Sequence, residues 1–397
     1  MSGAAMADAR GPDVFVVACE SSADALGADL VRAIAAAEPG ALFRGIGGAR
    51  MAAAGVPSLF PIEDLVTIGL GGVIVRLPTI LRRLRQTVEA IVASPPDVLV
   101  LIDAPDFTHR VAARVRRRLP HLPVVKYVSP TVWVWRPGRA RAMRSSIDLV
   151  LALLPFEPQV HRDLGGPDCV YVGHPLLGRL KDLRRSPDDH VRAGEPPVIL
   201  ALPGSRSAEI HRLGAIFGYA LGLVAKGQGA INVVLPTLPH LVGELTQATA
   251  DWPVRPRIVT TEAEKHAAFR RARAALAASG TVTLELALAG IPTVAAYRIP
   301  MIEGLLLRSV VKVHPVIKER SVILANLVLG ELAIPEFLQS RCTAANLASA
   351  LEEVLVDTPA RRRQLEAFAR LDGILGIGNE SASERAARAV LGLVGRR

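Results

Sequence analysis

Residues 198–212 read VILALPGSRSAEIHR and join an apolar run of strand length to a Gly-Ser turn and the start of a helix. A strand that turns directly into a helix leaves backbone N–H groups at the positive end of the helix dipole, where phosphate oxygens are favoured. Arg206 adds a planar cation suited to a diphosphate. The turn lacks the Gly-x-x-x-x-Gly-Lys-Ser/Thr pattern of ATPases. Gly204, Ser205 and Arg206 therefore form a candidate phosphate-binding turn, with a purely structural turn as the alternative.

The same alternation of apolar runs and helical segments continues along the whole chain. Such runs, separated by helices, indicate parallel sheets covered on both faces. The expected strands are 14–18, 98–102, 124–128, 149–154, 170–172, 198–202, 231–235, 274–278 and 293–296. A polar, proline-containing stretch, 181–197, separates the two halves. We therefore expect an α/β fold of two Rossmann-like lobes facing each other across a cleft, with domains 13–180 and 198–357 and C-terminal helices over 358–397.

Composition narrows the class of protein. The chain has 397 residues, of which 50% are hydrophobic, and a formal net charge of +10. Only 4% of residues are aromatic and they do not alternate with basic residues, so no nucleic-acid partner is expected. An anionic membrane surface or phosphorylated substrates explain the charge instead. The three cysteines lack metal-site spacing, and neither a membrane span nor a secretory signal is recognisable, so we expect a metal-free cytoplasmic protein.

Acidic residues follow two expected strands of the first lobe. Ligands of parallel sheets bind beyond the carboxyl ends of the strands. Asp103 follows the strand 98–102, and partial desolvation there would raise its basicity, so it is the first candidate for a general base. Helix capping is the alternative role for Asp103, although Asp106 is better placed as the cap. Glu20 and Asp24, after the first strand, are rival bases.

A second phosphate-type loop follows the strand 274–278. Ser279, Gly280 and Thr281 lead into a helix, and Glu285 lies one turn further on. This arrangement suits a sugar nucleotide, because the loop would meet phosphate while the carboxylate accepts two hydroxyl groups. A solvated helix-surface glutamate is the alternative, although its neighbours are apolar. In the first lobe Trp133 is a candidate wall of a sugar or acyl pocket, with core packing as the other interpretation.

The segment 65–92 combines apolar and basic residues without an acid before Glu89. Such a segment is typical of helices that lie in a membrane interface, although a helix packed on a sheet also has one apolar stripe. Gly71, Gly72 and Pro78 predict a broken helix with a loop. The candidate acceptor or membrane contacts are Ile68, Val73, Ile74, Leu77, Arg76, Arg82 and Arg83.

Eight short blocks of sequence carry a resemblance to one enzyme family. The chain resembles the lipid-A-disaccharide synthases, which are membrane-associated bacterial glycosyltransferases. The blocks occur in family order within about residues 13–350, and their combination is specific. They are 18–24 (ACESSAD), 45–48 (GIGG), 102–107 (IDAPDF), 127–133 (YVSPTVW), 154–157 (LPFE), 172–174 (VGH), 202–206 (LPGSR) and 278–281 (ASGT).

The resemblance implies a GT-B fold and an inverting reaction. UDP-2,3-diacylglucosamine and 2,3-diacylglucosamine 1-phosphate would give the β-1,6-linked lipid A disaccharide 1-phosphate and UDP, without a metal or another cofactor. Asp103 falls at the family's base position, Arg206 would stabilise the leaving diphosphate, and Glu285 and Asn326 would bind the donor. The expected location is the anionic cytoplasmic face of the inner membrane. The C-terminal helices are expected to pack back on the first lobe, and the oligomeric state stays open.

The chain departs from the family pattern at four positions. Cys19 and Ala23 replace two glycines of the first loop, Ala325 replaces a proline and Gly72 replaces a glutamate. A positive φ at the first two positions would be strained. Three other interpretations share parts of the pattern: a peptidoglycan glycosyltransferase, a UDP-sugar epimerase, and a basic membrane-surface protein without catalysis.

Overall fold

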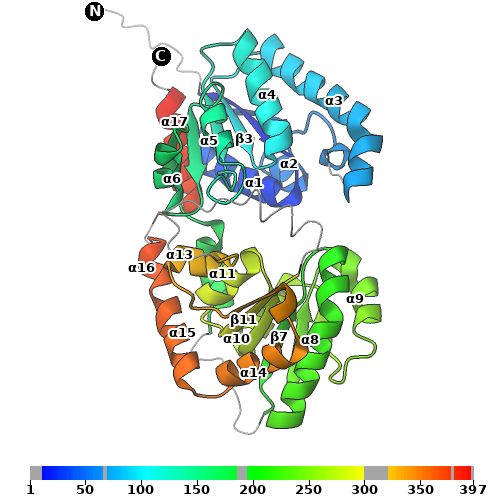
Figure 1. Ribbon diagram of the computed structural model, residues 1–397. Coiled ribbons are helices and arrows are strands. Elements are labelled where there is room, and N and C mark those ends of the chain that lie inside the picture. Colours follow the sequence, from blue (N-terminus) through cyan, green and yellow to red (C-terminus); the bar gives the residue numbers. More distant parts are fainter. Residues whose placement is uncertain (1–10, 66–68, 186–194, 299–320, 377–379, 395–397) are drawn as a thin grey trace, which may run out of the picture. The chain divides into compact units, whose positions relative to one another are not determined.

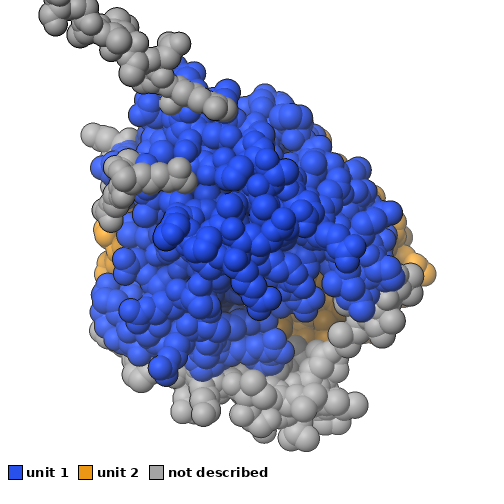
Figure 2. Space-filling view, turned by 90° about the horizontal axis from the view of Figure 1, so that it is seen from above, with its two compact units in different colours: residues 1–177, 378–397 blue, residues 178–377 orange. Residues whose placement is uncertain are grey.

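The computed structural model describes residues 11–65, 69–185, 195–298, 321–376 and 380–394. The chain divides into two compact units, which Figure 2 shows in different colours. Unit 1 comprises Met1–Leu177 and Gly378–Arg397, and unit 2 comprises Gly178–Ile377. Each unit is built around one parallel six-stranded sheet with helices on its faces (Figure 1).

The sheet of unit 1 has the order β2-β1-β3-β4-β5-β6. Its inner strands are apolar because both faces are covered: Val14 and Val16 pack in one core, whereas Phe15 and Val17 pack in the other. The strands are β1 (Asp13–Ala18), β2 (Leu42–Ile46), β3 (Val98–Ile102), β4 (Val124–Tyr127), β5 (Leu149–Ala152) and β6 (Asp168–Tyr171). The helices are α1 (Ser21–Ala37), α2 (Ala49–Ala53), α3 (Gly69–Ala93), α4 (Pro105–Arg118), α5 (Gly138–Met143), α6 (Glu157–Asp163) and α17 (Ala382–Val394).

The sheet of unit 2 has the order β12-β11-β10-β7-β8-β9, which read from β9 is the 3-2-1-4-5-6 order of Rossmann folds. The strands are β7 (Val198–Leu202), β8 (Asn232–Pro236), β9 (Arg257–Val259), β10 (Ala272–Ala278), β11 (Thr293–Tyr297) and β12 (Glu336–Leu338). The helices are α7 (Leu180–Leu183), α8 (Ser207–Gln228), α9 (Val242–Ala248), α10 (Glu262–Arg271), α11 (Thr281–Leu288), α13 (Leu324–Leu329), α14 (Ala344–Leu355), α15 (Pro359–Ala369) and α16 (Leu371–Ile374). Short 3-10 helices cover Ile62–Asp64, Pro175–Arg179, Pro239–Leu241 and Gln339–Arg341.

Each sheet has one point at which the strand order reverses. In unit 1 this point lies between β1 and β3, and in unit 2 between β7 and β10. The loops after two such strands diverge to opposite faces of the sheet and leave a crevice, where ligands of parallel sheets bind. The candidate loops of the sequence follow these four strands, so each unit brings its own pair together.

The expected α/β fold with two Rossmann-like lobes is confirmed, and β3 and β7 begin and end at the predicted residues. The sequence missed β2, β9 and β12, which are short strands without a continuous apolar run. The break predicted near Gly71, Gly72 and Pro78 is wrong: α3 is one helix of 25 residues with Pro78 inside it. Pro78 lies on an exposed side of the helix, where its ring does not disturb the packed core.

The C-terminal helices divide between the two units. α15 and α16 belong to unit 2, where Gln364 hydrogen-bonds both backbone groups of Thr293, and the chain changes to unit 1 only at Gly378. There α17 packs with α1 (Figure 1), and Ala386, Ala387 and Val390 join the core that contains β1. The domain boundaries predicted from the sequence lie at 180, 198 and 358. In the structure the chain passes from unit 1 to unit 2 after Leu177 and returns to unit 1 after Ile377. Among the described helices, none has the length and apolar character that crossing a bilayer requires.

Candidate functional site

Unit 2 contains a pocket of about 390 Å³ at the carboxyl ends of its strands. The loops that follow β7 and β10 form two of its walls, and α10 contributes a third. The pocket therefore lies at the point where the strand order reverses, the position that the fold reserves for ligands. Its polar lining includes Gly204, Ser205, Arg206, Glu209, Thr237, Thr260, Thr261, Glu262, Lys265, Ser279, Gly280 and Thr281.

The turn after β7 is built to receive a negative charge. Gly204 has φ +131°, and a Cβ there would lie 2.4 Å from the side chain of Glu209, so the position requires glycine. The Ser205 N–H donates to Glu209 Oε2 at 3.0 Å. Arg206 Nη1 lies 3.3 Å from Glu209 Oε1, with its side chain 80% exposed. A carboxylate of the chain itself thus occupies the N-terminus of α8, as a phosphate would.

The turn after β10 is held by a hydrogen bond from a side chain of the turn to the main chain at Val322. Ser279 Oγ donates to the Val322 carbonyl at 2.7 Å, and the Val322 N–H donates to Glu336 Oε2. Asn326 is fully buried: its Nδ2 donates to Glu336 Oε1 and the Ile334 carbonyl, and its Oδ1 accepts from the Ile334 N–H. The structure therefore engages Asn326 inside the fold rather than in the lining of the pocket, and connects it to Ser279 through Glu336.

Glu285 is buried on α11, and its Oε1 lies 2.7 Å from Lys265 Nζ. Lys265 lines the pocket from the first turn of α10, so the ion pair connects Glu285 to the pocket. The sequence analysis missed Lys265. Its position was nevertheless recognisable, because Thr261 and Glu264 form a capping box that begins α10 and places Lys265 in the first turn of this helix.

In unit 1 the chain turns sharply after β3. Asp103 has φ +47° and Ala104 has φ +42°, which are left-handed conformations that residues with a Cβ rarely adopt. Val128, directly after the neighbouring β4, has φ +73°. Strained backbone of this kind concentrates at functional sites. The Asp103 side chain is half-buried, and within the described ranges it makes no hydrogen bond or ion pair.

The rival acids of the first loop have other surroundings. Asp24 is buried and accepts hydrogen bonds from the N–H groups of Gly48, Arg50 and Met51 at 2.7 to 3.0 Å, so it caps α2. Glu20 is exposed at the N-terminus of α1. Neither Cys19 nor Ala23 has a positive φ, so the two replacements of glycine cause no backbone strain.

A buried lysine that the sequence analysis missed lies beneath the Asp103 turn. Lys126, in the middle of an apolar strand, is fully buried, and its Nζ donates to the main-chain oxygen of Asp103 and to Thr108 Oγ1. Burial lowers the pKa of Lys126 to about 8, an effect that the Asp103 carboxylate opposes. The run VVKYV gave one signal, since a lysine amid apolar strand residues is unusual.

Trp133 is buried in unit 1. Its Nε1–H donates to Glu157 Oε1 at 3.4 Å, and its ring packs edge-on against Phe156. Burial raises the pKa of Glu157 to about 7, while the N–H groups of Leu153 and Leu154 oppose that shift. The contacts favour the packing interpretation for Trp133.

The exposed side of α3 carries both apolar and basic side chains. Leu77 is 42% and Leu81 45% exposed, and Arg82 is exposed. The expectation that these arginines lack acidic neighbours is wrong for Arg83, which forms a 2.6 Å ion pair with Asp64. Arg76 is exposed and donates to the Glu63 carbonyl. Ile68 and the side chains of Val73 and Ile74 lie outside the described residues.

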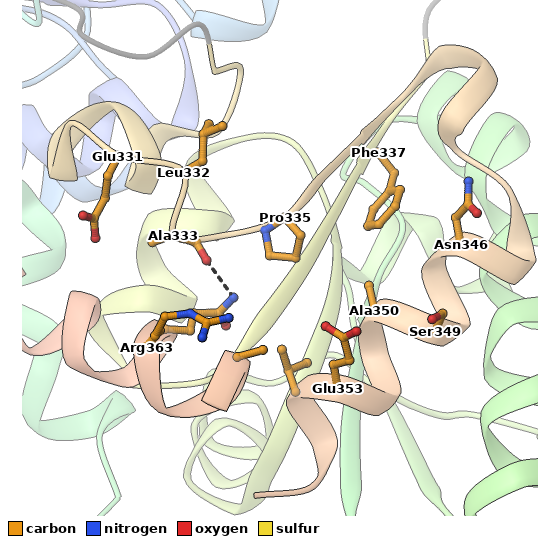
Figure 3. Close-up of a pocket in the computed structure, with 13 residues that line it drawn as sticks. Glu331, Leu332, Ala333, Pro335, Phe337, Asn346, Ser349, Ala350, Glu353 and Arg363 are labelled. Atoms are coloured by element: carbon orange, nitrogen blue, oxygen red, sulfur yellow. Dashed lines mark hydrogen bonds between the residues drawn. The ribbon is translucent and has the colours of Figure 1, made fainter. Parts of the chain in front are cut away.

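Two other hollows lie on the described surface of the units. A groove of about 430 Å³ between α3 and α4 has an apolar floor and four arginines, and is lined by Leu81, Leu84, Arg85, Val88, Glu89, Arg114, Arg117 and Arg118. A larger pocket of about 580 Å³ lies beside β12, α14 and α15 (Figure 3), and none of the predicted site residues lines it. Among the described residues no three metal-ligating side chains come together.

The comparisons with known proteins agree over nearly the whole chain. The family model described as lipid-A-disaccharide synthetase matches residues 14–390. The lipid-A-disaccharide synthase of Nitrobacter hamburgensis is 54% identical over 380 residues, which are 95% of this chain and 94% of that protein. The corresponding protein of one Rhodopseudomonas palustris strain is 53% identical over 383 residues, 96% of each chain.

Solved structures show the same fold at low identity. The UDP-GlcNAc 2-epimerase of Neisseria meningitidis bound to UDP-GlcNAc has a TM-score of 0.63 and 11% identity, covering 96% of this chain and 99% of that one. MurG of Acinetobacter baumannii has a TM-score of 0.55 and 14% identity, with the same coverage. Identities of this size establish a shared architecture and no more.

Proposed function

The chain belongs to the lipid-A-disaccharide synthase family, and from that premise we propose which of its residues perform the reaction. It is a glycosyltransferase of lipid A biosynthesis. The reaction transfers 2,3-diacylglucosamine from UDP to 2,3-diacylglucosamine 1-phosphate, and the products are the β-1,6-linked disaccharide 1-phosphate and UDP. The resemblance found in the sequence is thereby confirmed. The likeness to the epimerase and to MurG shows a shared fold alone.

We assign the UDP part of the donor to the pocket of unit 2. Supporting observations are the glycine-dependent turn at Gly204, the exposed guanidinium of Arg206 and the N-termini of α8 and α11 around one pocket. These groups would bind the diphosphate and stabilise the charge that develops on it as the glycosidic bond breaks. Glu285 would accept the ribose hydroxyls, with Lys265 holding its carboxylate. Asn326 would act at a distance, through Glu336 and the segment that supports Ser279.

We assign the general base to Asp103. In an inverting transfer the acceptor hydroxyl attacks the anomeric carbon as the carbon–oxygen bond to the diphosphate breaks, and one base takes the hydroxyl proton. Asp103 is half-buried at the point where the strand order of the unit 1 sheet reverses, and within the described residues its carboxylate has no partner that must be displaced. Asp24 is occupied by three N–H donors, which favours Asp103 over it. Glu20 is the remaining rival.

We propose that the exposed side of α3 attaches the enzyme to the cytoplasmic face of the inner membrane. Both substrates carry fatty-acyl chains, so the active enzyme has to meet them at a lipid surface. Leu77 and Leu81 offer apolar side chains, and the arginines of the α3–α4 groove offer positive charge for anionic lipids.

The position of Arg206 in the pocket of unit 2 is the main observation that supports UDP binding there, and a titration with UDP tests it. We expect Arg206→Ala to weaken UDP binding in isothermal titration calorimetry at least about tenfold, as loss of a charged hydrogen bond does. Arg255→Ala removes an exposed arginine elsewhere in unit 2 and is the matched control. Equal UDP affinity of Arg206→Ala and the wild type would place the diphosphate somewhere else.

A further inference from the structure

Lys126 is an ionisable side chain that the proposed mechanism leaves without a role. It lies in β4, a central strand of the unit 1 sheet, and is fully buried. Burying an ammonium group is unfavourable unless the surrounding groups compensate for the lost water. At this buried position of the strand an apolar side chain would pack equally well, so packing does not explain why the residue carries a charge.

Among the described residues, the ammonium group hydrogen-bonds to the turn that presents Asp103 and to Thr108 in the first turns of α4. Nζ donates to the Asp103 main-chain oxygen and lies 3.0 Å from Thr108 Oγ1. Thr108 Oγ1 in turn lies 2.8 Å from the Asp103 oxygen and 3.0 Å from the Ala104 oxygen. The Lys126 ammonium and the Thr108 hydroxyl thus both donate to the main-chain carbonyl of Asp103, and the hydroxyl also donates to that of Ala104. Both residues of this turn have left-handed backbone.

Other ionisable groups around Lys126 come from the loops after β1 and β3 and from α4. Burial raises the pKa of the Cys19 thiol to about 12 and lowers that of His109 to about 4, so both are uncharged near neutral pH. On β5 the residues aligned with β4 are Leu149, Val150 and Leu151, which are apolar. The charges that face each other here are therefore the Lys126 ammonium and the Asp103 carboxylate.

We propose that Lys126 is a positioning residue for Asp103: its buried ammonium holds the strained Asp103–Ala104 turn, and so the direction in which the Asp103 carboxylate is presented. The proposal rests on the assignment of Asp103 as the base. A turn with two left-handed residues that contain a Cβ relaxes readily when its restraint is removed. Displacement of a catalytic group by about 1 Å is enough to reduce turnover strongly.

Replacement by methionine keeps the length of the side chain and removes the charge. We expect Lys126→Met to lower kcat at least about tenfold, to change the KM of the acceptor less than about threefold, and to leave Tm unchanged or raised. Lys226→Met alters an exposed lysine on α8 and is expected to behave as wild type. An unchanged kcat in Lys126→Met, with Asp103→Asn inactive, would overturn the positioning role alone. A fully active Asp103→Asn would overturn the base assignment as well.

The pH profile gives a readout that a merely structural role would not change. Since the pKa of Lys126 is lowered to about 8, wild-type kcat should fall above about pH 8 as the ammonium loses its proton, and Lys126→Met should lack this alkaline limb. Ala104→Gly provides a second variant, because glycine adopts the left-handed conformation without strain. It should flatten the alkaline limb of the wild type and partly restore kcat in Lys126→Met. An alkaline limb that is the same in Lys126→Met as in the wild type would overturn the proposal.

Discussion

At the scale of single residues, side chains near both candidate crevices divide into those that face a ligand and those that maintain the backbone around it. The positions of Asp103 and Arg206 beyond the ends of β3 and β7 were predictable from the sequence, because each lies one to four residues after an apolar strand. Lys126 and Lys265 were not predictable, because their roles depend on neighbours that are distant in sequence. Asp24 and Trp133 have the expected residue types, yet backbone N–H groups and Glu157 engage them inside the fold.

Lys126 also makes a prediction about stability. A lysine whose pKa is lower in the folded chain than in the unfolded chain destabilises the fold while it is protonated, and this penalty disappears as pH rises from about 8 to about 10.5. The difference between these values corresponds to about 3 kcal/mol. Lys126→Met should therefore unfold at higher denaturant concentration than the wild type at pH 7.

Chemical denaturation at pH 7 and pH 10 measures this effect. The advantage of Lys126→Met should shrink at pH 10, where the wild-type lysine is mostly neutral in the folded chain. Lys226→Met, with its exposed side chain, should match the wild type at both pH values. A Lys126→Met protein less stable than the wild type at pH 7 would show that the ammonium contacts outweigh the burial penalty.

At the scale of elements, the long apolar strands were predictable and the edge strands were not. β3 and β7 are continuous apolar runs because both faces of the sheet are covered. β12 has only three residues, all half-buried, so its sequence contains no apolar run that would predict a strand. It forms because its backbone pairs with that of β11. For α3 the sequence predicted a break that the structure does not have. Its packing against α4 outweighs the low helix propensity of glycine and proline.

The exposed side of α3 gives the prediction for membrane attachment. Leu77→Asp combined with Leu81→Asp should reduce binding to vesicles of phosphatidylglycerol and phosphatidylcholine at least about tenfold, because two apolar side chains are lost and charge repulsion is added. Both side chains are about half exposed, so Tm should change little. Vesicle co-sedimentation at low and physiological salt measures the binding.

Leu223→Asp is the matched control for this experiment. Leu223 is equally exposed, at 45%, but lies on α8 in unit 2. It should leave vesicle binding unchanged. Wild-type affinity of the α3 double variant for these vesicles would contradict attachment through α3.

At the scale of the whole molecule, the chain forms two units with separate cores, and its last described helix, α17, is part of unit 1. The sequence indicated two lobes through the linker-like stretch 181–197, but it did not show where the C-terminal helices divide. That division depends on which core accepts each apolar face. Phe368 and Leu371 are buried with unit 2, whereas Val390 enters the core of unit 1.

This arrangement predicts the effect of removing α17. A chain that ends at Gly376 loses three side chains from the unit 1 core, which should destabilise that unit by about 3–5 kcal/mol and lower its unfolding temperature by about 10 °C. Unit 2 keeps its core and its pocket, so UDP binding should persist. Differential scanning calorimetry with and without UDP separates the two transitions, and Arg388→Ala on the exposed side of α17 should shift neither. A single transition lowered as a whole would contradict independent cores.

The most direct test of the account is a single-turnover reaction of UDP-2,3-diacylglucosamine with 2,3-diacylglucosamine 1-phosphate, followed by product formation in the wild type and in Asp103→Asn. We expect rapid formation of the acylated disaccharide 1-phosphate by the wild type and a loss of at least about a hundredfold in Asp103→Asn, with UDP binding retained because the donor pocket lies in unit 2. Equal rates of product formation in the two proteins would contradict Asp103 as the base and direct the search to Glu20.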